Sequence, residues 1–259
     1  MVTINVSLVQ IQAMMLIFLR ILALLFYMPL FENRQVPLAF KAGLAMTMSF
    51  LLFPRIGPTL PAMPHTPLAF GLGVAGEVLI GITLGLAVRL FFTGIQLAGQ
   101  LAGFQMSLTV ANILDPISNS QISIIAEINN LVTMLVFLII NAHHMLILAL
   151  MESFRSLPPL GMSISQGVGE YMLQLAGGIF VAALQVGAPL IVTMMITSVA
   201  LGLMARTVPQ MNVFLVAMPA KILVGFIVMA MSIPYLITYL KLGFAQLYQQ
   251  LFQLLRLME

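Results

Sequence analysis

Several residue types on which catalysis and crosslinking depend are scarce or missing. The 259 residues include no cysteine, which excludes disulfides, thiol catalysis and thiolate metal sites. Asp115 is the one aspartate, whereas an aspartyl protease needs a pair. No phosphate-binding loop and no HExxH motif is present. The adjacent His143 and His144 point about 100° apart on a helix and cannot chelate one ion together. We therefore expect a protein that is not an enzyme and has no cofactor or metal.

Charge is also scarce, and this scarcity indicates a membrane protein. Charged residues make up 7% of the chain and hydrophobic residues 61%, whereas a soluble domain carries about 25% charge. Some windows contain no Asp, Glu, Lys or Arg, and each is long enough to cross a bilayer as a helix: residues 90–114, 128–151, 171–205 and 222–240. The net charge of +3 is too scattered to predict nucleic-acid binding. The basic residues do not gather on alternate loops, so they give no orientation.

The pattern predicts an all-α membrane-class protein with about six to seven hydrophobic helices in a single domain, 1–259. The N-terminal segment has no basic region before its apolar run, so we expect it to be retained as the first helix. In the tail, 241–259, leucines and glutamines fall on different faces, which predicts an amphipathic helix on a membrane surface or, preferably, against a partner subunit. The other helices are expected near residues 6–30, 38–53, 68–92, 94–111, 122–152, 170–205 and 213–240.

Proline and glycine mark the expected breaks and close contacts. The five prolines of 54–67 predict an extended connection outside the helices, and the segments 115–120 ("DPISNS") and 157–163 ("LPPLGMS") predict further breaks. The GxxxG pairs Gly81/Gly85 and Gly99/Gly103 predict tight helix–helix packing.

Polar residues in the apolar segments leave two interpretations open. On one straight helix over 122–152, five of them would share one face, either bonding to neighbouring helices or lining an aqueous path: Glu127, Asn130, Asn141, His144 and Glu152. Arg20, Glu77 and Arg89, with Pro189, Pro219 and Pro234 breaking helices, would also suit the midplane site of a secondary transporter. Against a transporter, the two halves show no internal repeat.

Four blocks, in order, carry a family resemblance over residues 14–240. They are "FLRILALLFYMPLFENRQVPLAFKAGLAMTMSFLLFP" (18–54), "GEVLIGITLGLAVRLFFTGIQLAGQLAGFQMSLTVANILDP" (76–116), "NAHHMLILALMESFRSLP" (141–158) and "RTVPQMNVFLVAMPAK" (206–221). They resemble the FliR/SctT type III secretion export-gate family. Ala142 replaces the glycine that this family commonly shows before its two histidines.

The resemblance implies a non-enzymatic subunit of the flagellar type III protein export gate, forming with FliP and FliQ the channel through which unfolded flagellar proteins leave the cell. FlhB is the implied partner at the cytoplasmic side, and membrane lipid and unfolded export substrates complete the implied partners, with no nucleic acid. The implied fold consists of broken and bent helical hairpins packed in a multi-subunit assembly in the inner membrane, at the flagellar basal body and partly above the bilayer plane. An injectisome subunit is the near alternative and a small-solute transporter the remote one.

The resemblance also implies two sets of site residues. A pore plug corresponds to about Phe104–Ser120, within which the implied plug residues are Phe104, Gln105, Met106, Leu108, Val110, Ile113, Asp115 and Pro116. For the stretch 205–221 we predict a bent polar joint that faces other subunits, and the implied assembly residues there and elsewhere are Arg206, Pro209, Gln210, Asn212, Pro219, Lys221, Glu77, Arg89, Glu127, Asn141 and His144.

Overall fold

The computed structural model describes residues 7–31, 36–57, 64, 66–108, 123–161, 166–208 and 213–259. In this part of the chain every regular element is helical and no strand occurs, which confirms the all-α prediction. Five helices are long and apolar enough to cross a membrane, or up to six if α5 and α6 form one broken span. In order, the elements are α1 (Leu8–Tyr27), the 3-10 turn η1 (Pro29–Phe31), α2 (Leu38–Ile56), α3 (Pro67–Gln105), α5 (Ile124–Ile139), α6 (Ala142–Ser156), α7 (Gln166–Thr207) and α8 (Val213–Met258).

Two of these helices are longer than the sequence pattern predicts. Segments 68–92 and 94–111 were expected to be separate, but α3 runs through Thr93 without a break and ends at Gln105. The amphipathic tail is likewise the last part of α8, continuous through Lys241. Neither junction holds a proline or a residue with positive φ, so nothing in the backbone stops the helix there.

The segment 122–152 is, in contrast, divided where no proline or glycine marks a break. α5 ends at Ile139 and α6 starts at Ala142, and between them Asn141 has φ 56° and ψ 32°. Asparagine adopts this left-handed conformation more readily than most residues. The prediction of one continuous polar face over 122–152 is therefore wrong. Glu127 lies on α5 and Glu152 on α6.

Prolines at both ends of 54–67 belong to helices, which corrects the prediction of an extended connection there. Pro54 lies in the last turn of α2. Pro67 is the first residue of α3, where the missing N–H would have no partner in any case. The turn 157–161 confirms the described part of the third predicted break. Residues 115–120, 162 and 163 lie outside the described residues.

Prolines also sit inside the two longest helices without breaking them. α7 continues through Pro189, and α8 continues through Pro219 and Pro234, so the expectation of broken helices there is wrong. A proline cannot donate to the carbonyl four residues earlier. For Pro189 that carbonyl belongs to Gln185, and it accepts a hydrogen bond of 3.1 Å from the hydroxyl of Tyr235 on α8.

The chain forms two compact units, and it passes from one to the other four times. Unit 1 contains residues 1–90, 141–175 and 245–259, and unit 2 contains residues 91–140 and 176–244. The helices α3, α7 and α8 each contribute to both units. Whether the two units fold as a single domain is not tested by this division, so the single-domain prediction stays a prediction.

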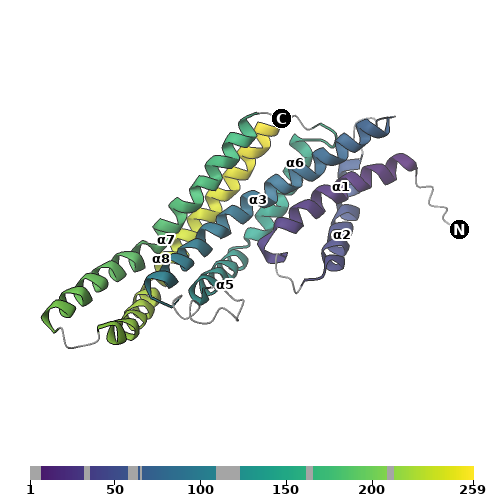
Figure 1. Cartoon of the computed structure of the whole chain (residues 1–259). Coiled ribbons are helices and arrows are strands. Elements are labelled where there is room, and N and C mark those ends of the chain that lie inside the picture. Colours follow the sequence, from purple (N-terminus) through teal and green to yellow (C-terminus); the bar gives the residue numbers. More distant parts are fainter. Residues whose placement is uncertain are drawn as a thin grey trace. The chain divides into compact units, whose positions relative to one another are not determined.

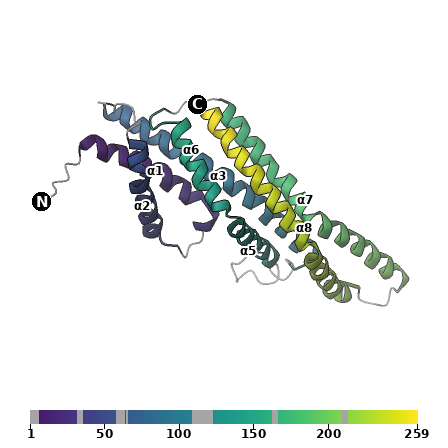
Figure 2. The ribbon, with the colours of Figure 1, turned by 180° about the vertical axis from the view of Figure 1, so that it is seen from behind.

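Glycines of α3 bring α1 close in unit 1 (Figures 1 and 2). A Cβ added at Gly81 would lie 2.7 Å from the Cβ of Ala23, and one at Gly85 would lie 2.8 Å from the Cβ of Tyr27. These distances are too short for any side chain, so the predicted tight contact at this GxxxG pair is confirmed.

The C-terminal part of α8 also packs within unit 1, beside the start of α7 (Figures 1 and 2). Tyr171 of α7 donates a 3.0 Å hydrogen bond to Gln253 of α8. The leucines on the apolar face of this segment are buried inside the chain, so the prediction that this face meets a membrane surface or a partner is wrong: Leu247, Leu251, Leu254 and Leu255.

Unit 2 repeats the glycine contact with α5. A Cβ at Gly99 would lie 2.9 Å from the backbone nitrogen of Ala126, which confirms close packing at the second GxxxG pair. In the same unit the rings of Phe91, Phe92, Phe137 and Phe244 pack together, with the Phe91 and Phe244 centroids 4.8 Å apart and those of Phe137 and Phe244 5.4 Å apart. Small residues thus bring the backbones together, and large rings fill the remaining space.

Candidate functional site: a buried ion pair and a capped helix end

An arginine and a glutamate from apolar helices form a buried ion pair in unit 1. Arg20 of α1 is 0% exposed and Glu77 of α3 is 1% exposed. The arginine donates from Nε to Glu77 Oε2 at 2.7 Å and from Nη2 to Oε1 at 3.0 Å. This two-bond fork is the strongest geometry that an arginine and a carboxylate can form.

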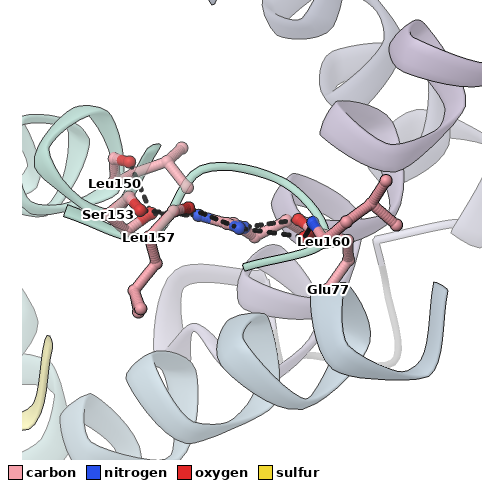
Figure 3. A network of polar contacts seen from close by, with 6 residues as sticks. Glu77, Leu150, Ser153, Leu157 and Leu160 are labelled. Carbon is pink, nitrogen blue, oxygen red and sulfur yellow. Dashed lines mark hydrogen bonds and ion pairs between the residues drawn. The ribbon is translucent and has the colours of Figure 1, made fainter. Parts of the chain in front are cut away.

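The remaining donors of Arg20 bind Ser153, at the end of α6, and Leu157, in the turn after it, which are both labelled in Figure 3. Nη1 donates to the carbonyl of Ser153 at 2.7 Å and to its hydroxyl at 3.3 Å, and Nη2 donates to the carbonyl of Leu157 at 3.0 Å. The ring of Phe154 lies under the guanidinium, 4.3 Å from Cζ. An arginine has five N–H groups, and these contacts use all of them.

The same carboxylate holds a strained turn. Glu77 Oε1 accepts a 3.2 Å hydrogen bond from the backbone N–H of Leu160, which Figure 3 shows from close by. Leu160 has φ 73°, a conformation that costs a non-glycine residue about 1–3 kcal/mol. Its side chain packs where a Cβ on Gly73 would stand and contacts the cluster around Ala13 and Leu16. Leu160 is therefore held at both its backbone and its side chain.

This arrangement suits a structural role rather than a chemical one. A general base needs a free carboxylate lone pair facing a substrate, and Glu77 is enclosed by Arg20 and Leu160. In the described part of the chain, no group of three or more His, Cys, Asp or Glu side chains could hold a metal ion. The buried charges connect α1, α3 and the end of α6, and so fix the core of unit 1.

The predicted plug begins at the end of α3, and the described residues there form a helix cap. Ser107 has φ 62°. Its N–H donates to the carbonyl of Phe104 at 3.0 Å, and the N–H of Leu108 donates to that of Gly103 at 3.1 Å. This pair of bonds is a Schellman motif, usually built on glycine. The motif ends α3 at Gln105, six residues before the end of the predicted segment 94–111.

The described plug residues differ in exposure. Phe104 is 69% exposed, whereas Met106 is fully buried in unit 2. Met106 packs with Ile125 and Met194 and fills the space beside Gly225. Gln105 and Leu108 are half-buried, and Val110, Ile113, Asp115 and Pro116 lie outside the described residues. Met106 thus anchors this end of the segment in the core of its own chain.

The predicted assembly residues are mostly at the surface of the chain. Arg206, Pro219, Glu127, Asn141 and His144 are exposed, and Arg89 and Lys221 are half-buried. Pro209, Gln210 and Asn212 lie outside the described residues. Glu77 differs from all of these because its charge is satisfied inside the chain.

Arg20 is the residue that the sequence-based site prediction leaves out. It was grouped with Glu77 only as a possible transporter group. A signal for the pairing exists, since each is an isolated charge in an apolar helix, and such charges pair with one another at membrane depth. Their separation of 57 positions in the sequence prevents any local pattern from identifying the partner.

The fold and the buried network together define an all-α membrane protein whose charges stabilise its own packing, with no catalytic arrangement among the described residues. Its sequence matches the family described as bacterial export proteins, family 1, over residues 11–247. The chain belongs to this family.

The relatives agree with this assignment. The flagellar biosynthetic protein FliR of Bacillus subtilis is 32% identical over 235 residues, covering 87% of this chain and 88% of its own length. FliR of Escherichia coli is 32% identical with 90% and 88% coverage, and FliR of Aquifex aeolicus is 30% identical with 85% of each chain covered. The resemblance to the FliR family is therefore confirmed. The chain is a membrane-embedded component of a bacterial export apparatus, not an enzyme. This family assignment argues against the alternative of a small-solute transporter.

Proposed function

We propose that this chain is the FliR-type subunit of the flagellar type III protein export gate. In this proposal it forms, with FliP and FliQ, the channel for unfolded flagellar proteins, and FlhB associates at the cytoplasmic side. The assembly stands in the inner membrane at the flagellar basal body, partly above the bilayer plane on the periplasmic side. The names of the relatives favour the flagellar branch over the injectisome branch.

The uncovered apolar surface of the long helices carries the proposal. In the most apolar windows of α7 and α8, 28% and 6% of the residues are buried by the chain itself. A helix that met only lipid would need few polar groups, but these helices also expose glutamine and arginine side chains, including Gln185 and Arg206. Mixed surfaces of this kind fit partner subunits and an aqueous channel better than lipid.

Assembly is the first property to test, at the end of α7. Arg206 is exposed in the last turn of α7, where it has room to bind a partner's acceptor. We expect Arg206→Ala to lower the recovery of FliP and FliQ with the tagged chain by about tenfold or more, because losing one charge-assisted hydrogen bond costs about 1.5–3 kcal/mol. The measurement is co-purification from native membranes, normalised to the amount of tagged chain.

Arg256→Ala is the matched control because Arg256 is an exposed arginine in the last turn of α8. Its substitution should leave recovery unchanged. Equal recovery for both variants would argue against an assembly role for Arg206, and a chain that purifies alone and monodisperse would argue against the gate itself.

The plug is proposed for the segment between Leu108 and Ser123. A Cβ on Gly103, in the last turns of α3, would meet the hydroxyl of Ser123, so the two ends of the segment lie close together. In a closed pore, the apolar side chains of Val110 and Ile113 would exclude water. The buried Met106 fixes the point of departure.

Deleting residues 109–113 tests the plug while leaving Met106 and the helix cap in place. We expect cells with this variant to become permeable to small solutes, because the apolar seal is shortened. Met106→Ala is the contrasting variant, and it should lower the amount of folded chain by removing core packing. Unchanged permeability in a fully assembled deletion complex would refute the plug.

A further inference from the structure

A pocket in unit 1 combines apolar walls with two guanidinium groups. It has a volume of about 410 Å³. One wall comes from α2 and the other from α6 and the turn after it, and the lining residues are Leu52, Arg55, Ile56, Met151, Phe154, Arg155 and Pro158. Five of these are apolar and two are cationic, so the pocket is amphipathic, as a lipid molecule is.

The two arginines lie where a lipid headgroup would be. Arg55 is in the last turn of α2 and Arg155 is in the last turn of α6. α2 is a candidate membrane span, and α6 ends the candidate broken span. The ends of apolar spans lie at the level of the headgroups, where phosphates are found.

The charges at this pocket leave a net positive balance. Arg155 faces Glu152 at 3.4 Å, with its side chain 62% exposed, and such an exposed pair is weak. Arg55 is exposed and has no ion-pair partner among the described residues. Two guanidinium groups and one carboxylate therefore give a formal side-chain charge of about +1, which one additional anion would neutralise.

Apolar side chains lead away from both arginines toward the middle of each span. Leu51 precedes Arg55 by one helical turn and is 74% exposed, and Leu148 precedes Arg155 by two turns and is 52% exposed. Neither leucine is covered by its own chain. An acyl chain lying along them would bury both and would continue into the pocket over Met151.

We propose that this pocket binds an anionic phospholipid, with its phosphate between Arg55 and Arg155 and an acyl chain over Leu52 and Met151. Arginine forks bind phosphate through paired hydrogen bonds, and basic pockets between membrane helices select anionic headgroups. A free inorganic anion would leave the apolar walls exposed to water. The pocket also shares Phe154 with the Arg20 network, since that ring lies 4.3 Å from Arg20 Cζ, so a bound lipid supports the core of unit 1.

The test counts the lipids bound to the intact complex by native mass spectrometry. The detergent-purified complex is titrated with phosphatidylglycerol or with phosphatidylcholine. We expect the double variant R55Q/R155Q to need about 25-fold more phosphatidylglycerol for equal occupancy, roughly fivefold for each arginine, and to bind phosphatidylcholine as the parent does. R256Q removes an exposed arginine from another helix end of the same unit and should behave as the parent.

A second variant separates the headgroup from the acyl chain. Met151→Trp fills the pocket and keeps both arginines, and we expect it to lose the bound phosphatidylglycerol as well. Equal phosphatidylglycerol binding by R55Q/R155Q and the parent would overturn the proposal. So would loss of a partner subunit from the double variant without loss of lipid, because an acidic side chain of that partner would then occupy the site.

Discussion

At the scale of single residues, the buried pair Arg20–Glu77 makes a sharp prediction about stability. Glu77→Gln keeps the shape of the side chain but leaves the Arg20 charge buried without its counter-ion. Breaking a buried pair from one side costs about 3–5 kcal/mol. We expect a much lower midpoint of thermal unfolding in detergent, and less chain recovered from membranes.

Replacing both partners should recover part of this loss. In R20M/E77M no charge stays buried, but the carbonyls of Ser153 and Leu157 and the N–H of Leu160 lose their partners. Glu152→Gln is the control for the exposed pair Glu152–Arg155 and should change stability by less than about 1 kcal/mol. If Glu77→Gln proves as mild as Glu152→Gln, the network does not stabilise unit 1.

Single residues also show where prediction of the fold from the sequence fails. Ser107, Asn141 and Leu160 all have positive φ, yet none is a glycine, the residue type from which a positive φ is usually predicted. Asn141 divides a predicted helix in two, and Ser107 ends another. At Leu160 the conformation is held by a hydrogen bond to a distant segment, the one to Glu77. A local pattern cannot contain that information.

At the scale of elements, glycines on one helix should respond with opposite signs. Gly81→Ala on α3 places a Cβ 2.7 Å from that of Ala23 on α1, and overpacking costs about 1–3 kcal/mol. Gly71→Ala on the same helix meets nothing within 4 Å and should stabilise α3 by about 0.5–1 kcal/mol. Thermal unfolding of the two variants measures the difference, and equal effects would mean that α1 and α3 are not in close contact.

The glycine contacts illustrate what the sequence predicts well about elements. Spacing alone identified Gly81/Gly85 and Gly99/Gly103 as packing positions, because small residues one turn apart form a flat ridge on any helix. It did not identify the partner helices, α1 and α5, or the continuity of α7 through Pro189. There the hydroxyl of Tyr235, on another helix, donates to the carbonyl that the proline leaves free.

At the scale of the whole molecule, the family and the all-α class followed from sequence, since hydropathy and several ordered motifs are properties of the chain as a whole. The sequence does not predict which apolar faces meet partner subunits and which meet lipid, because leucine is found in both settings. One exposed apolar residue on α7 and one on α2 allow the two settings to be compared. Val199 on α7 is 65% exposed and Leu51 on α2 is 74% exposed.

A bulky apolar substitution distinguishes the two settings. Fluid lipid accommodates a tryptophan, whereas a packed subunit interface does not, because extra volume in a close-packed contact forces its neighbours apart. We expect Val199→Trp to reduce recovery of FliP and FliQ with the tagged chain several-fold at unchanged chain level, as about 1–3 kcal/mol of overpacking implies. Leu51→Trp, on the face assigned to lipid, should leave recovery intact. If Val199→Trp assembles as well as Leu51→Trp, this face of α7 meets lipid, and the partner surface of the chain must lie elsewhere.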